Sequence, residues 1–173
     1  MKTLLLLCIS VMPIMACAPK LQGVVYDESG NASLATSMKK VATNDQYSGT
    51  LRSAAVSINN TLYLDLGIEV SIAFRRFYIE QGEYISVQLS DNSFVNLSND
   101  QRVRSHSEMV LGNPRQVVQV LCPLSDSNIQ RLMAHDITSI SIVTIDKKSF
   151  EFEIEPKKSK MIQEMLVLIT TPK

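Results

Sequence analysis

Apolar side chains alternate with other residues from Thr61 to Arg75. Every second position carries a leucine, isoleucine, valine or phenylalanine: Leu62, Leu64, Leu66, Ile68, Val70, Ile72 and Phe74. Because successive side chains of a strand point to opposite faces, this pattern predicts a long strand with one buried face. The phase is kept across Gly67, which predicts a bend without an inserted residue. The phase then changes at Arg75-Arg76, where we expect a bulge or turn.

Shorter period-two patterns follow at intervals of about ten residues, as in an all-β domain. They predict a hairpin around Ser90-Asp91-Asn92, a further strand before Pro123 and a final pair of strands near the C-terminus. The expected strands are 83–89, 93–97, 116–122, 137–145 and 150–154. Ile72, Phe74, Val87, Phe152 and Ile154 each occupy the apolar phase, so we expect them to share one core.

Two helices are expected beside these strands. Ser125 or Asp126 is a suitable cap for a short helix that continues to about Ala134. Pro156 is suited to open a second, C-terminal helix, whose apolar side chains form a stripe on one face. The sequence therefore predicts a mainly β chain: an antiparallel β-sandwich or curled sheet, with one short helix and a C-terminal amphipathic helix packed on it.

The N-terminus has the pattern of an export signal. Lys2 precedes twelve uncharged residues, Leu4 to Met15, a stretch too short to span a bilayer as a helix. Ordinary cleavage after Ala18 would cut directly before Pro19, whose fixed φ fits a protease cleft poorly. The alternative is cleavage before Cys17.

Residues Ile14-Met15-Ala16-Cys17 resemble the lipobox of bacterial lipoproteins, although Met15 departs from the usual small or β-branched residue. The resemblance implies that Cys17 becomes the acylated N-terminus and carries a lipid such as palmitate. The protein would then be anchored to a membrane of the bacterial cell envelope, the outer membrane being favoured. Its domain would lie in the periplasm or at the cell surface, and the lipid would be its membrane partner.

The chain is expected to divide into three segments. Residues 1–16 form the signal peptide, 17–47 the lipid anchor and a polar tether, and 48–173 a single β-rich domain. Within the tether, one short strand is expected at 21–26. The spacing of Leu34, Met38, Val41 and Ala42 also fits a helix.

The composition narrows the possible partners. The chain has 17 basic and 17 acidic residues, and loss of Lys2 with the signal peptide leaves a net charge near minus one. A chain without excess positive charge is a poor ligand for nucleic acid. Of the three cysteines only Cys122 would remain as a free thiol, which excludes an intramolecular disulfide. Its apolar surroundings predict a small buried side chain and not a nucleophile.

The β-rich part is also similar to small, uncharacterised envelope lipoproteins of the Bacteroides type. The similarity consists of an Asp-containing hairpin turn at Leu89-Ser90-Asp91, a helix start at Leu124-Ser125 and a final strand with Phe152-Glu153-Ile154. It covers roughly the last 110 residues and implies neither an activity nor catalytic residues.

The sequence offers little catalytic chemistry. It has two histidines, His106 and His135, and it lacks the recognised hydrolase, phosphate-loop and metal-ligand motifs. We therefore expect neither an enzyme, a metal nor a cofactor. The alternative is an unrecognised hydrolase that uses His106, beside Ser105 and Ser107, or His135 as its base.

One stretch combines cations with aromatic rings. Arg75, Arg76 and Tyr78 are candidates for binding an anionic glycan or a lipid headgroup through arginine forks. The other interpretation is a strand edge with solvated arginines. Lys157, Lys158 and Lys160 form a weaker signal for contact with anionic lipid. The function expected from the sequence is thus a non-catalytic envelope module that binds a protein, peptide or glycan, or has a structural role.

Overall fold

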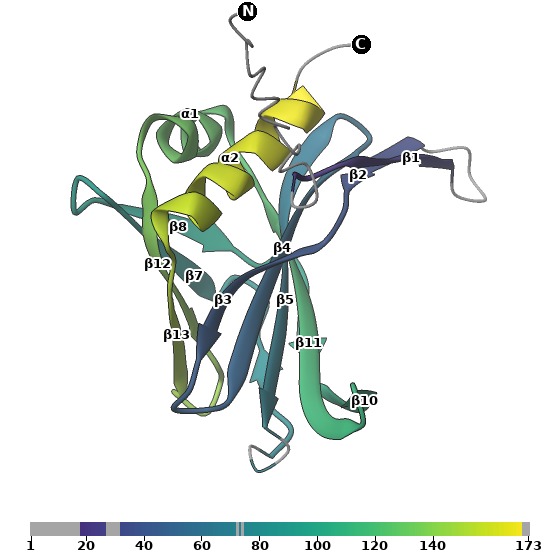
Figure 1. The fold of residues 1–173 in the computed structure, drawn as a ribbon, viewed down its shortest axis with the longest axis vertical. Coiled ribbons are helices and arrows are strands. Elements are labelled where there is room, and N and C mark those ends of the chain that lie inside the picture. Colours follow the sequence, from purple (N-terminus) through teal and green to yellow (C-terminus); the bar gives the residue numbers. More distant parts are fainter. Residues whose placement is uncertain (1–17, 27–31, 72, 74, 171–173) are drawn as a thin grey trace, which may run out of the picture.

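The computed structural model describes residues 18–26, 32–71, 73 and 75–170. The described chain is mainly β, with antiparallel sheets and two helices, as the sequence predicts (Figure 1). In chain order the elements are β1 (Leu21–Tyr26), β2 (Ala32–Thr36), β3 (Lys39–Asn44), β4 (Gly49–Ile58), β5 (Thr61–Ser71), β6 (Tyr78–Ile79), β7 (Tyr84–Leu89), β8 (Phe94–Ser98), β9 (Val103–Arg104), β10 (His106–Val110), β11 (Asn113–Pro123), α1 (Asp126–Ala134), β12 (Ile137–Val143), β13 (Ser149–Glu153) and α2 (Pro156–Thr170).

The larger sheet has seven strands in the order β1-β2-β4-β5-β11-β10, and β3 pairs with the part of β4 that β2 leaves free. Asn59 and Asn60 connect β4 to β5 and have φ values of 50° and 65°. A two-residue hairpin turn with both φ values positive matches the twist of the flanking strands, and asparagine tolerates that conformation.

The long alternating stretch forms β5 in the centre of this sheet. Leu64, Leu66, Ile68 and Val70 are completely buried. The pairing of β5 with both neighbours continues through Gly67 without a register shift, so the absence of a bulge there is confirmed. Ile72 and Phe74, which we expected in the core, lie outside the described residues.

The smaller sheet contains β13-β12-β7-β8 in that order. The predicted hairpin is β7-β8, and Asn92 in its turn has a φ of 63°. Val87, Phe152 and Ile154 from this half of the chain are buried in the same hydrophobic cluster as the inner face of β5. For these three residues the predicted common core is confirmed.

The edges of the two sheets meet at β3 and β13. The Asn44 side chain and the Tyr47 hydroxyl both donate hydrogen bonds to the backbone carbonyl of Glu151, at 2.8 and 2.7 Å. The Tyr47 ring packs edge-on against Phe150 and Phe152, with centroids 5.2 and 5.9 Å apart. This seam closes one side of a sandwich-like core.

Helix α2 lies across one end of the sheets (Figure 1). Its apolar stripe of Met161, Ile162, Met165 and Leu166 is buried in the common core, which confirms the predicted packing. Helix α1 is capped by Ser125, whose hydroxyl accepts a hydrogen bond from the Asn128 N–H. Every buried residue of the cluster lies between Val41 and Leu166, so residues 18–173 contain the described core completely.

The structure differs from the polar tether expected before residue 48. The predicted strand β1 is present, but residues 32–44 form two further strands of the larger sheet, and the helix suggested there is wrong. The physical reason is that β2 and β3 pair with β4, which satisfies their backbone groups and buries Thr36 and Val41. The folded sheet therefore begins only four residues after Cys17.

Candidate ligand-binding surface around Tyr78

Tyr78 is held at the surface by a short two-stranded ribbon. Strand β6 pairs with β9 so that Tyr78 lies opposite Arg104. Phe77 and Ile79 on either side are buried, and the alternation of a strand therefore leaves the Tyr78 side chain half-exposed. The Phe77 N–H donates to the buried hydroxyl of Ser105 at 2.9 Å, which fixes the start of the ribbon.

Two arginines lie over the Tyr78 ring. The guanidinium carbons of Arg102 and Arg104 are 4.6 and 5.3 Å from the ring centroid, within the range of cation–π attraction. Arg102 also pairs with Glu80 at 3.0 Å, whereas the Arg104 side chain is exposed. We call Tyr78, Arg102 and Arg104 the arginine–tyrosine cluster.

Arg75 and Arg76, the candidates from the sequence, lie in the connection between β5 and β6. Both are exposed, and β5 ends at Ser71, before the pair. None of the ion pairs recorded for the described residues involves either arginine. Of the three predicted site residues, only Tyr78 is in the cluster.

The residue types of the cluster are those that recognise anions in proteins. A guanidinium presents its donors as a planar fork that matches carboxylate, sulfate and phosphate oxygens, and stacking on an aromatic ring preorganises that plane. Arg104 adds donors that no described carboxylate occupies. The sequence reasoning missed Arg102 and Arg104, although the cation–apolar–cation order of Arg102-Val103-Arg104 is typical of a short strand with one face out.

The hydrogen bonds described for Ser105 and Ser107, the serines on either side of His106, are made with other residues. The His106 side chain is 65% exposed on β10, and its Nε2 lies 3.5 Å from a Glu108 carboxylate oxygen. The neighbouring Ser105 hydroxyl is buried against the Phe77 N–H and the Gln116 side chain. Ser107 accepts a hydrogen bond from the Gln116 amide. Both serines therefore have structural partners.

His135 ends α1 and lies 3.6 Å from an Asp91 carboxylate oxygen. Ser93 donates its hydroxyl to the same carboxylate at 2.6 Å and, with its N–H, holds the pKa of Asp91 below the ordinary value; His135 contributes less. The carboxylate thus lies between the serine and the histidine. Nucleophilic catalysis requires the serine to hydrogen-bond the histidine directly, so this arrangement supplies no activated hydroxyl.

Two buried titratable groups lie within the larger sheet. Burial raises the pKa of the Asp65 carboxyl, although Gln119 donates a 2.7 Å hydrogen bond to one of its oxygens. Its other oxygen has no hydrogen-bond partner among the described residues. Cys122 is completely buried, and burial raises its pKa to about 12. Such a thiol is not a nucleophile at neutral pH.

Two negative findings apply to the part of the chain that the structure describes. No three histidine, cysteine or acidic side chains there are grouped so that they could hold a metal ion. No helix within the described ranges is long and apolar enough to cross a bilayer.

Comparison with known proteins identifies no relative. No family model matches the chain, and neither the curated proteins nor the solved structures include a significant match. The function must therefore be inferred from the residues of this chain alone.

Proposed function

We propose that the protein is a lipid-anchored, non-catalytic module of a bacterial cell envelope that binds an anionic glycan through the arginine–tyrosine cluster. The observation that carries this proposal is the pair of guanidinium groups over Tyr78. The β6–β9 ribbon carries Tyr78 and Arg104, and Arg102 directly precedes it, so both guanidinium groups lie at the surface within reach of a carboxylated or sulfated sugar chain. Binding costs less when the receptor groups are ordered beforehand.

The anchoring part of the proposal is supported by the residues around Cys17 and by the position of the sheet. The Ile14-Met15-Ala16-Cys17 motif precedes a β-domain whose first strand starts at Leu21. Acyl chains contribute about 0.8 kcal/mol for each methylene buried in the bilayer, so two or more chains give a stable attachment. The hydrolase alternative lacks supporting geometry at both His106 and His135, as described above.

Isothermal titration calorimetry with an oligogalacturonate, a carboxylated sugar chain, tests the ligand proposal. We expect saturable binding to residues 18–173 and at least a tenfold loss of affinity in the double variant Arg102→Ala/Arg104→Ala, because charge-assisted bonds are lost. The matched control is Lys147→Ala/Lys148→Ala, which removes two exposed cations from the turn between β12 and β13 and should bind normally.

Two results would change the proposal. Equal affinity of the wild type and the arginine variant would overturn the assignment of the cluster. In the second result, a hexaglutamate peptide displaces the oligogalacturonate and binds more tightly than the sugar chain does. That result would move the ligand class from glycans to acidic peptides.

A further inference from the structure

The folded part of the chain begins within three residues of Cys17. Pro19 is buried, and Lys20 is joined to Ser37 through two hydrogen bonds of 3.3 and 2.7 Å. Three residues of extended chain span at most about 11 Å. A lipid on Cys17 would therefore hold this side of the domain directly against the bilayer surface.

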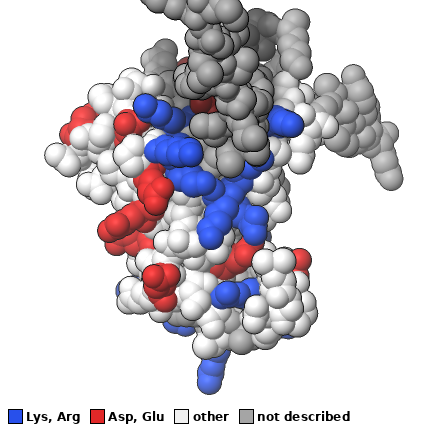
Figure 2. Space-filling model, viewed as in Figure 1, with Lys and Arg blue, Asp and Glu red and all other residues white. Residues whose placement is uncertain are grey.

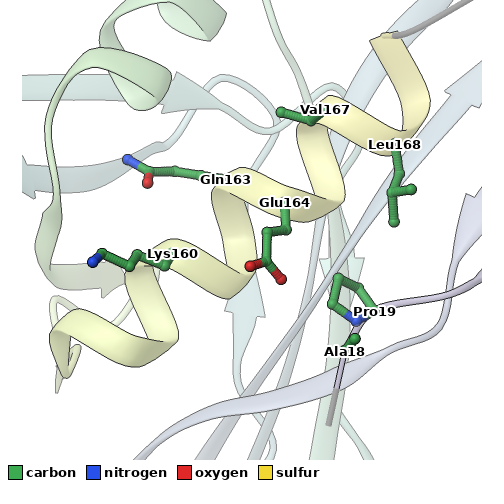
Figure 3. Close-up of a pocket in the computed structure, with 7 residues that line it drawn as sticks. All are labelled: Ala18, Pro19, Lys160, Gln163, Glu164, Val167 and Leu168. Atoms are coloured by element: carbon green, nitrogen blue, oxygen red, sulfur yellow. The ribbon is translucent and has the colours of Figure 1, made fainter. Parts of the chain in front are cut away.

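An open groove lies on this side of the domain, between the start of the described chain and α2 (Figure 3). Its volume is about 650 Å³. Val167 lies at the edge of the groove, is 43% exposed, and gives it an apolar end. The lining residues are Ala18, Pro19, Lys160, Gln163, Glu164, Val167 and Leu168.

One lysine, Lys160, lines this groove and is exposed. Lys20 and Lys157 are also exposed, and Lys158 and Lys40 line a second groove between α2 and the edge of β3. Figure 2 shows Lys and Arg side chains grouped on the face that carries α2. None of the ion pairs recorded for the described residues includes a lysine. We call these five residues the lysine face.

The lysines at the start of α2 do not serve helix stability. Lys157 and Lys158 follow directly after Pro156 in the first turn, which has no acidic residue, and Lys160 lies at the start of the second turn. The N-terminal end of a helix carries partial positive charge, so cations there are unfavourable. Contact of these exposed ammonium groups with anionic phosphates would offset this unfavourable position.

We propose that the lysine face is the membrane-contacting surface of the protein and that its ammonium groups bind the phosphates of anionic phospholipids. This inference rests on the anchoring at Cys17 in the proposed function. Lysine is a compact charge with three donors, which suits headgroup phosphates in varied orientations. Three lysines, Lys40, Lys158 and Lys160, and three glutamates, Glu153, Glu155 and Glu164, line the two grooves. The excess of positive charge on this face comes from the exposed Lys20 and Lys157 outside the grooves.

Vesicle co-sedimentation of residues 18–173, which lack the acylated cysteine, tests the surface independently of the anchor. The probes are vesicles of phosphatidylcholine alone and of phosphatidylcholine with 30% phosphatidylglycerol. We expect binding only to the anionic vesicles, and at least a tenfold lower partition coefficient for Lys157→Glu/Lys160→Glu. The matched control, Lys147→Glu/Lys148→Glu, makes the same charge change at the other end of β13 and should bind like the wild type.

A thermal melt separates this effect from unfolding. Glutamate is favourable in the first turn of a helix, where Lys157 lies, and Lys160 is exposed in the next turn. The Lys157→Glu/Lys160→Glu variant should therefore melt at or above the wild-type temperature while its vesicle binding falls. Equal binding of both double variants, or equal binding to neutral and anionic vesicles, would overturn the proposal. If either of these two outcomes is obtained while Cys17 is acylated in cells, the proposal of a lipid anchor stands and the proposal for the lysine face is refuted. Preferential anionic binding with an unacylated Cys17 would support the face and refute the anchor.

Discussion

Phe152 belongs to the smaller sheet and packs at the seam where the two sheets meet. Its side chain is completely buried, and its ring packs against Tyr47 with centroids 5.9 Å apart. We predict that Phe152→Ala lowers the free energy of unfolding by about 3 to 5 kcal/mol, the usual cost of such a cavity. Urea denaturation measures this value. Phe94→Ala, at a 53% exposed position, is the control and should cost less than about 1 kcal/mol. A similarly small cost for Phe152→Ala would contradict the burial.

Asp65 should make folding less favourable at neutral pH. Its folded-state pKa is raised above the ordinary 3.8 by burial, so the unfolded chain releases this proton first as the pH rises. Below about pH 3.8 both states are protonated and the penalty vanishes. We therefore predict that Asp65→Asn increases the free energy of unfolding at pH 7 and has a smaller effect at pH 3.5. Urea denaturation at the two pH values checks this, and a wild type more stable than the variant at pH 7 would refute it.

Cys122 should be inert in the folded protein. The thiol is completely buried in the inner face of β11, and its pKa is raised to about 12. We predict that iodoacetamide labels residues 18–173, in which Cys122 is the single thiol, only after addition of denaturant. Mass spectrometry follows the labelling. Rapid modification of the native protein would show that the site is open.

At the scale of elements, a strand could be predicted from the sequence when its inward positions carry large apolar residues. Strand β5 and the β7-β8 hairpin alternate large apolar residues with polar ones, and both were predicted, although β5 ends at Ser71 and the predicted strand continued to Phe74. Strand β4 was missed because alanine and serine fill its inward positions, as at Ser53 and Ala55. Asn59-Asn60 before the alternation was the available signal for a hairpin that would have revealed β4.

The candidate site was only partly predictable because it is formed by segments that are distant in the sequence. Tyr78 and Arg104 are brought together by a ribbon of two short strands, with a whole hairpin between them in the sequence. Periodicity indicates which face of a strand is buried, but it does not indicate which distant strand becomes its neighbour. The sequence therefore pointed to Arg75 and Arg76, next to Tyr78 in the chain, while Arg102 and Arg104 supply the cations over the ring.

Helix α2 is predicted to be essential for folding. Ile162 is completely buried, so Ile162→Ala should cost about 2 to 5 kcal/mol, and removal of residues 157–173 should cost far more because it opens the end of the core. Thermal melts of residues 18–173 and 18–156 compare the two forms. The control Val167→Ala changes an exposed residue of the same helix and should cost less than about 1 kcal/mol. An unchanged midpoint after the deletion would show α2 to be an accessory arm.

At the scale of the whole molecule, the shortness of the connection before β1 matters most. If Cys17 is acylated as proposed, a chain fixed at Lys20 would restrict which side of the domain faces the bilayer, whereas a long tether would let the domain turn freely. Under the two proposals, the lysine face and the arginine–tyrosine cluster would have separate roles. The first would orient the domain on anionic lipid, and the second would bind the glycan.

The central claim is the lipid anchor at Cys17. Mass spectrometry of the N-terminal peptide from the protein isolated from its native membrane tests it most directly. We predict a peptide that begins at Cys17 and carries the mass of acyl chains, and Cys17→Ser should release the exported protein to the soluble fraction. An unmodified peptide beginning at Ala18 or Pro19 would contradict the claim and leave a secreted β-domain without an anchor.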